Sequence, residues 1–294
     1  MEKLSNPQQT IAVIKKYGFD FKKQFGQNFL IDAHVLEKII AAAEITKEDY
    51  VVEIGPGIGT LTQYLAEAAR GVCAVEIDRR LIPVLEETLQ EYDNVTIVNQ
   101  DIMKTDLCEL VREKNGGRPI KVVANLPYYI TTPIIMRLFE EKVPLDSVTV
   151  MVQKEVADRM RASAGSKEYG ALSLAVQYYA EPYYAATVPV NCFIPRPGVN
   201  SAVIRLKRHE VPPVSVPDEK QMFDMIRAAF GQRRKTMVNA LSGAPGLHYS
   251  KEELTQVLQQ LGLDPRVRGE ALSLEEFAKL TVRLSEMDRK ETEG

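Results

Sequence analysis

The sequence predicts an α/β protein: a parallel, doubly wound sheet followed by a small α-helical domain. Three observations support this fold class. Short apolar runs alternate with helical stretches through about the first two thirds of the chain. A glycine-rich turn follows the first of these runs. Beyond a segment rich in valine and proline, 209–217, the pattern is helical. We therefore expect two domains, residues 1–209 and residues 210–294.

The predicted elements follow in order along the chain. Strands are expected where apolar, β-branched residues run for four to six positions, and helices where apolar residues recur at helical spacing. Asp32 and Ser250 are expected N-caps, and Ser273 with Glu276 forms a capping box. The predicted strands are 51–54, 72–78, 95–98, 122–124, 147–152, 183–188 and 202–206. The predicted helices are 7–17, 34–43, 60–69, 169–180, 218–229, 235–241, 251–261 and 273–284.

The composition is that of an ordinary globular protein. Of the 294 residues, 45% are apolar and 26% are charged. No apolar run reaches transmembrane length, and the opening MEKLSNPQQT lacks the plan of a signal peptide. The three cysteines are far apart and show no zinc spacing, so we expect reduced thiols in a cytoplasmic protein with no metal and no membrane contact. The net charge of −3 excludes a uniformly basic nucleic-acid binder, so local patches must supply any such contact.

Residues 22–30, KKQFGQNFL, mix cations, amides and aromatic rings between two predicted helices. Contacts with an RNA backbone and its bases would use such a mixture. A solvated arm that packs through its two phenylalanines would explain the same residues. This segment alone leaves both interpretations open.

The first three predicted strands each end in a group suited to a nucleoside. The first strand enters a G-x-G-x-G turn at Gly55, where glycine lets a ligand approach the backbone closely. Glu76 ends the second strand, where a carboxylate can accept hydrogen bonds from ribose hydroxyls. Asp101 follows the third strand and is placed to accept from an adenine amine. Each acid alone is more often a helix cap, but their placement at successive strand ends indicates a ligand site.

The fourth strand, 122–124, runs into the sequence Asn-Leu-Pro-Tyr-Tyr. The Asn125 side chain can accept a hydrogen bond from an exocyclic amine. Pro127 biases Leu126 towards an extended backbone, so that the Leu126 carbonyl can become a second acceptor. Tyr128 can stack on a flat ring. A strand end with a proline turn over a tyrosine-capped core is the alternative for this segment by itself.

Basic side chains recur in the C-terminal part of an otherwise acidic chain. A run of charge is usually a solvated face, but its recurrence against an acidic total favours a phosphate-binding surface. The residues concerned are Arg205, Lys207, Arg208, Arg233, Arg234, Lys235, Arg266 and Arg268.

Taken together, these segments resemble the class I S-adenosylmethionine-dependent methyltransferases, and in particular the ribosomal RNA adenine dimethyltransferases. The resemblance covers about residues 20 to 280. Residues 232–236 (QRRKT) and 268–273 (RGEALS) are similar to the C-terminal domain of the small-subunit branch, the dimethyladenosine transferases. The resemblance also rests on residues 27–30, 53–59, 76–78, Asp101, 125–128 and 193–203 (FIPRPGVNSAV).

The resemblance implies a Rossmann-like methyltransferase sheet that is mostly parallel with its last strand antiparallel. It also implies dimethylation of N6 on two adjacent adenines in a 3′-terminal hairpin loop of 16S-type rRNA. The partner is then a precursor of the small ribosomal subunit, the methyl donor is S-adenosylmethionine, and we expect a monomer. The donor site is implied at Asn28, Leu30, Gly55, Glu76, Asp101 and Asn125. The catalytic groups implied are the Asn125 and Leu126 acceptors and the stacking rings of Tyr128 and Phe193.

Three other functions remain open. The large-subunit rRNA adenine dimethylases that confer antibiotic resistance share the catalytic domain, but the C-terminal segments favour the small-subunit branch. A nicotinamide dehydrogenase is disfavoured by the G-x-G-x-G spacing, because dinucleotide sites use G-x-G-x-x-G. A non-catalytic RNA-binding assembly factor is disfavoured because Asn125, Tyr128 and the glycines are present.

Overall fold

The computed structural model describes residues 3–18 and 28–293. Most of the predicted RNA-contacting segment, Lys22 to Gln27, lies outside the described residues. The chain divides into two compact units, Met1–Ala157 with Glu181–Arg208, and Asp158–Ala180 with His209–Gly294. The last boundary, between Arg208 and His209, lies next to the predicted boundary between residues 209 and 210. Residues 158–180, which were predicted to belong to the first domain, instead pack with the C-terminal helices.

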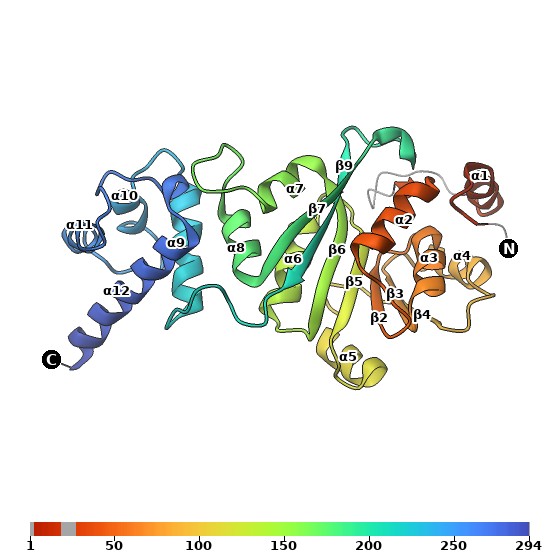
Figure 1. The fold of residues 1–294 in the computed structure, drawn as a ribbon, viewed down its shortest axis with the longest axis horizontal. Helices are drawn as coiled ribbons and strands as arrows, with labels where there is room; N and C mark the ends of the chain where they lie inside the picture. The colour runs from red at the N-terminus through yellow and green to blue at the C-terminus, as the bar shows by residue number, and fades with distance from the viewer. Residues whose placement is uncertain (1–2, 19–27, 294) are drawn as a thin grey trace. The chain divides into compact units, whose positions relative to one another are not determined.

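A seven-stranded sheet forms the centre of the first unit, in the order β4-β3-β2-β5-β6-β9-β7 (Figure 1). Strands β2 to β6 pair in parallel, and β9 runs antiparallel to β6. The predicted sheet, mostly parallel with its last strand antiparallel, is confirmed. The strands are β2 Tyr50–Ile54, β3 Gly71–Glu76, β4 Val95–Asn99, β5 Ile120–Asn125, β6 Leu145–Gln153, β7 Ala180–Val188 and β9 Ser201–Arg208. A separate antiparallel pair joins β1 Phe29–Leu30 to β8 Phe193–Ile194.

Helices α2 (Ala33–Ala42) and α3 (Thr60–Ala68) pack on the sheet, and their apolar side chains form one buried cluster with those of the strands. Every residue of β2 and β3 is buried, as expected for central parallel strands that are covered on both faces. Asp32 caps α2 as predicted, because its Oδ1 accepts hydrogen bonds from the backbone N–H groups of His34 and Val35 at 3.0 and 3.2 Å.

The glycine-rich turn between β2 and α3 depends on backbone conformations that favour glycine. Gly55, Gly57 and Gly59 have φ values of 68°, 62° and 93°. A Cβ atom at Gly57 would also lie 3.2 Å from the ring of Phe29. The G-x-G-x-G spacing therefore follows from the turn that leads from the carboxyl end of β2 into α3.

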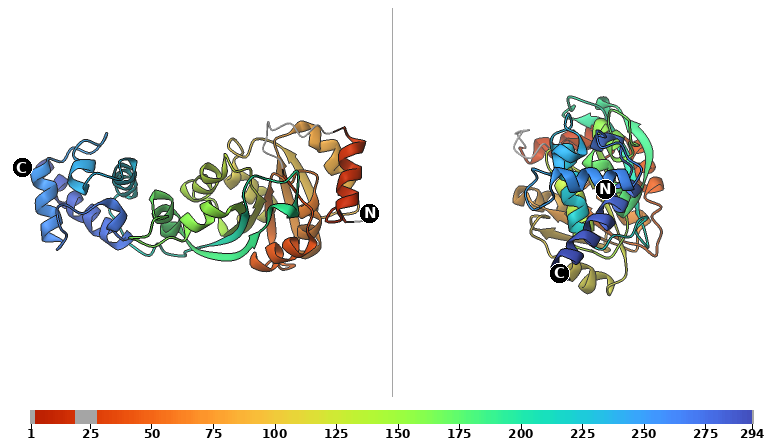
Figure 2. Two further views of the ribbon diagram at one scale, coloured as in Figure 1. Left: turned by 90° about the horizontal axis from the view of Figure 1, so that it is seen from above. Right: turned by 90° about the vertical axis from the view of Figure 1, so that its left-hand side faces the viewer.

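The second unit is built from helices, and Figure 2 shows α9 to α12 gathered together. Both expected caps form: Ser250 makes a capping box with Glu253, and Ser273 makes the predicted one with Glu276. None of the helices in residues 3–18 and 28–293 is long and apolar enough to cross a membrane. The remaining helices are α1 Pro7–Lys16, η2 Arg79–Leu81, α4 Ile82–Thr88, α5 Leu107–Asn115, α6 Thr131–Glu140, α7 Lys154–Met160, α8 Ala171–Tyr179, η3 Val190–Cys192, α9 Glu219–Gly231, α10 Met237–Leu241, α11 Lys251–Gln260, η4 Gly269–Ala271 and α12 Leu274–Glu293.

Candidate active site

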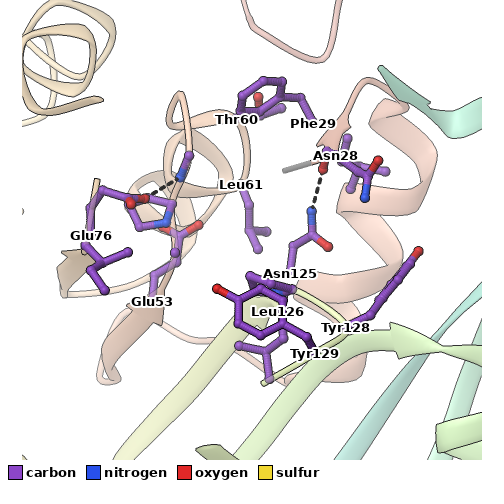
Figure 3. Close-up of a pocket in the computed structure, with 16 residues that line it drawn as sticks. Asn28, Phe29, Glu53, Thr60, Leu61, Glu76, Asn125, Leu126, Tyr128 and Tyr129 are labelled. Carbon is purple, nitrogen blue, oxygen red and sulfur yellow. Dashed lines mark hydrogen bonds between the residues drawn. The ribbon is translucent and has the colours of Figure 1, made fainter. Parts of the chain in front are cut away.

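A pocket lies at the carboxyl ends of β2, β3 and β5, the edge where open α/β sheets bind ligands (Figure 3). Strand β1 and the start of α3 complete its wall. The pocket brings together seven of the nine site residues predicted from the sequence. These are Asn28, Leu30, Gly55, Glu76, Asn125, Leu126 and Tyr128.

Glu76 holds the glycine-rich turn and the segment after β3 in place. Its Oε2 accepts a hydrogen bond from the Gly57 N–H at 3.2 Å, and its Oε1 accepts one from the Asp78 N–H at 2.8 Å. The side chain is buried, and this burial raises the pKa of Glu76 to about 7, although the backbone hydrogen bonds oppose the shift. The carboxylate still has lone pairs available for hydroxyl groups of a ligand.

Glu53 is a second buried carboxyl group in the pocket wall, and it was not among the site residues predicted from the sequence. It lies on β2 and is 1% exposed. Burial, strengthened by the nearby charge of Glu76, raises the pKa of Glu53 to about 8. Within the described part of the chain, neither its Oε2 nor the Oγ1 of pocket-lining Thr60 has a hydrogen-bond partner. A polar ligand in the pocket would supply partners for both.

Asn125, at the end of β5, is held in one orientation across the pocket. Its Nδ2 donates to the Asn28 carbonyl at 3.0 Å, so the side-chain Oδ1 is the atom left to accept a ligand hydrogen bond (Figure 3). Leu126 follows, 2% exposed, and its N–H donates to the Met151 carbonyl at 3.2 Å. No donor in the described residues reaches the Leu126 carbonyl. The two acceptors predicted from the sequence therefore lie on adjacent residues of one fixed loop.

The two tyrosines of the same loop lie differently. The Tyr128 hydroxyl shares a hydrogen bond with Ser201 Oγ, at the start of β9, at 2.9 Å. Burial raises the pKa of Tyr128. Tyr129 is 66% exposed and lines the pocket (Figure 3). The sequence predicted a stacking role for Tyr128 and none for Tyr129.

Asp101 and Phe193 do not line the pocket. The Asp101 Oδ1 accepts a hydrogen bond from the Met103 N–H at 2.9 Å, in the turn after β4. Phe193 is 2% exposed and packs in the apolar core, where β8 places it opposite Leu30 of β1. In this conformation the Phe193 ring has no open face for a base, so its predicted stacking role stays a prediction.

The basic residues predicted to contact phosphate fall in both units. Arg205 and Lys207 of β9 each pair with an acidic side chain of the first unit. Arg233 donates to two backbone carbonyls of the second unit. Arg234 and Lys235 are exposed. We therefore expect Arg234 and Lys235, rather than Arg233, to be available to phosphate.

The pocket presents oxygen acceptors, a glycine turn and apolar walls. A Cβ atom at Gly55 would meet no other atom within 4 Å, so there is space for a ligand against the backbone. Among the described residues, no three His, Cys, Asp or Glu side chains form a group that could hold a metal ion. The arrangement suits a nucleoside-bearing ligand held by hydrogen bonds beside a second amine-bearing ring.

The sheet order, the glycine turn after β2, Glu76 at the end of β3 and Asn125 at the end of β5 define a Rossmann-like class I methyltransferase. A solved dimethyladenosine transferase from Plasmodium falciparum is similar to this chain with a TM-score of 0.74 and 26% identity, over 88% of this chain and 98% of that one. The solved 23S rRNA methyltransferase ErmE has a TM-score of 0.68 and 26% identity, over 88% of this chain and all of that one.

The family model for ribosomal RNA adenine dimethylase matches residues 18–285. A protein of Lachnoclostridium phytofermentans is 64% identical over 95% of this chain and 97% of its own length. One of Alkaliphilus metalliredigens is 53% identical over 96% of this chain and 98% of its own length. Both are described as ribosomal RNA small subunit methyltransferase A. The chain belongs to the ribosomal RNA adenine dimethylase family, which confirms the resemblance seen in its sequence and implies S-adenosylmethionine as methyl donor.

Proposed function

We propose that this chain dimethylates N6 of two adjacent adenines in a 3′-terminal hairpin loop of small-subunit, 16S-type rRNA. The observation that carries the proposal is the 64% identity, over nearly the whole of both chains, to a protein described as a small-subunit rRNA methyltransferase. We further propose that it acts as a cytoplasmic monomer on a precursor of the small ribosomal subunit, and so takes part in its assembly.

We assign the donor site to the glycine turn and the strand ends. Gly55 leaves room for the donor against the backbone, and Asn28 and Leu30 close the opposite side. Glu76 would accept hydrogen bonds from the ribose hydroxyls. Asp101 would accept from the donor's adenine amine, because its one hydrogen bond with the Met103 N–H leaves other lone pairs of the carboxylate available. When bound, S-adenosylmethionine supplies a methyl group on a positively charged sulfur.

The loop after β5 would hold the target adenine. The N6 lone pair of adenine is delocalised into the ring, which makes this amine a poor nucleophile. Asn125 Oδ1 and the Leu126 carbonyl would accept the two N6 hydrogens and favour the pyramidal nitrogen needed for attack. Positioning of this kind can supply much of the rate acceleration. A strong general base is unnecessary, because N6 becomes acidic once it carries the new methyl group.

The proposal is tested with purified protein, S-adenosylmethionine and unmethylated ribosomal particles. Mass analysis of nucleosides and RNA fragments should find N6,N6-dimethyladenosine at two adjacent positions of the small-subunit RNA. Modification confined to large-subunit RNA would favour the activity that the name of ErmE describes. Tight binding to the particle with no methylated product would instead indicate a non-catalytic assembly factor.

A further inference from the structure

Tyr129 is a large aromatic side chain that lines the pocket and yet is 66% exposed. An exposed tyrosine by itself is ordinary on a protein surface. This one follows directly after the loop that carries both amine acceptors. In Figure 3 its hydroxyl points towards the side of the pocket where Glu53 and Glu76 lie.

The neighbouring Tyr128 is less available to a ligand. Its hydroxyl is engaged by Ser201 at 2.9 Å, and its ring is half-buried and points towards β9 (Figure 3). To leave this position it would have to give up that hydrogen bond. The ring that a base would meet first at the opening is therefore that of Tyr129.

The residues that line the pocket differ in exposure, so that Leu126 lies at its buried floor and Tyr129 at its exposed rim. Leu126, one of the two amine acceptors, is 2% exposed, whereas Tyr129 is 66% exposed. A target adenine whose N6 reaches the Leu126 carbonyl must insert deeply, as bases do in enzymes that act on a single nucleotide. The next nucleotide of the strand then remains at the rim, where Tyr129 lies.

We propose that Tyr129 is a substrate-positioning residue that stacks on the purine next to the target adenine. The inference rests on the proposed function. It accounts for a preference for two adjacent purines, because a purine offers the larger face to the tyrosine ring. Stacking of a base on an aromatic side chain is sequence-tolerant and contributes strongly to single-strand binding.

The test measures kcat and KM for methylation of small-subunit particles by the Tyr129→Ala and Tyr129→Phe variants. We expect Tyr129→Ala to raise the KM for RNA by about 5- to 150-fold, the factor that one base–aromatic stack provides. Tyr129→Phe, which keeps the ring, should remain close to wild type. The affinity for S-adenosylmethionine should stay unchanged in both. Tyr183→Ala is the matched control, because Tyr183 is 55% exposed and lies outside the pocket.

A second arm replaces the purine beside the target with an abasic nucleotide. This change should raise the KM of the wild-type protein for RNA. It should raise the KM of Tyr129→Ala little further, because the two changes remove the same stacking interaction. An unchanged KM for Tyr129→Ala, or additive effects of the two changes, would overturn the inference. So would a loss confined to donor affinity, which would place Tyr129 at the donor instead. A wild-type protein that cannot methylate RNA at all would overturn the proposed function, and this inference with it.

Discussion

Replacing Glu53 with glutamine should stabilise the protein, and increasingly so as the pH rises. Glu53 is fully buried on β2, and its pKa is raised to about 8 from an ordinary value of 4.5. Below pH 4.5 the carboxyl is protonated in both the folded and the unfolded chain. Between pH 4.5 and pH 8 the unfolded chain loses this proton while the folded chain keeps it, so stability falls as the pH rises.

The magnitude follows from the width of that window. Each pH unit within it lowers the free energy of unfolding by about 1.4 kcal/mol, which amounts to roughly 2–3 kcal/mol between pH 5 and pH 7. Glutamine has a similar volume and cannot ionise, so the variant does not undergo this decrease. The pKa of Glu76 is also raised, but Glu76 is present in both proteins and its contribution largely cancels in the difference.

Thermal melts at pH 5, 6 and 7 provide the assay. The chain has no tryptophan, so circular dichroism or calorimetry should be used instead of intrinsic tryptophan fluorescence. The Tm advantage of Glu53→Gln over wild type should grow by roughly 5–10 °C from pH 5 to pH 7. Glu48→Gln, at an exposed position, is the control and should show no such trend. A pH-independent difference for Glu53→Gln would refute the reasoning, because it would mean that Glu53 ionises as freely in the folded chain as in the unfolded one.

Two further predictions address the ligands. Glu76→Ala should weaken S-adenosylmethionine binding by about 1.5–3 kcal/mol for each charge-assisted hydrogen bond to the ribose that is lost. The affinity for RNA should stay the same. An unchanged affinity for the donor in calorimetric titration would exclude Glu76 from the donor site. The double variant Arg234→Ala, Lys235→Ala should weaken RNA binding and reduce the slope of log affinity against log salt by about 0.7–0.9 for each phosphate that is no longer neutralised. An unaltered slope would identify these two exposed cations as an ordinary solvated surface. Arg233 is left unchanged in this variant because it already donates hydrogen bonds to carbonyls of its own unit.

The parts of the site predicted from the sequence were those with a local signal. Apolar runs located β2, β3 and β5, and the polar residue at the end of each run located one wall of the pocket. Because the carboxyl ends of parallel strands meet at one edge of the sheet, Gly55, Glu76 and Asn125 could be expected to lie together.

The parts that sequence reasoning missed depend on long-range contacts or on side-chain orientation. The pairing of β1 with β8, which places Phe193 against Leu30, joins distant segments that no periodicity relates. The Asp101 carboxylate accepts from the backbone N–H two residues further on, a local turn that aspartate commonly forms, whereas the sequence predicted a role for it at the ligand. Glu53 did carry a signal, since a carboxyl group two residues before a glycine turn, in an otherwise apolar strand, must be buried.

The most direct test of the proposed mechanism is single-turnover methylation of a small-subunit particle by Asn125 variants. Asn125→Ala removes one of the two N6 acceptors, a hydrogen bond that strengthens as the nitrogen pyramidalises, so the rate should fall by about 10²–10³. RNA affinity should persist, because contacts to phosphate dominate it. Asn125→Asp keeps an acceptor oxygen and should retain more activity than the alanine variant, although it cannot keep the Nδ2 hydrogen bond to the Asn28 carbonyl. A near wild-type rate for Asn125→Ala would contradict the proposed mechanism.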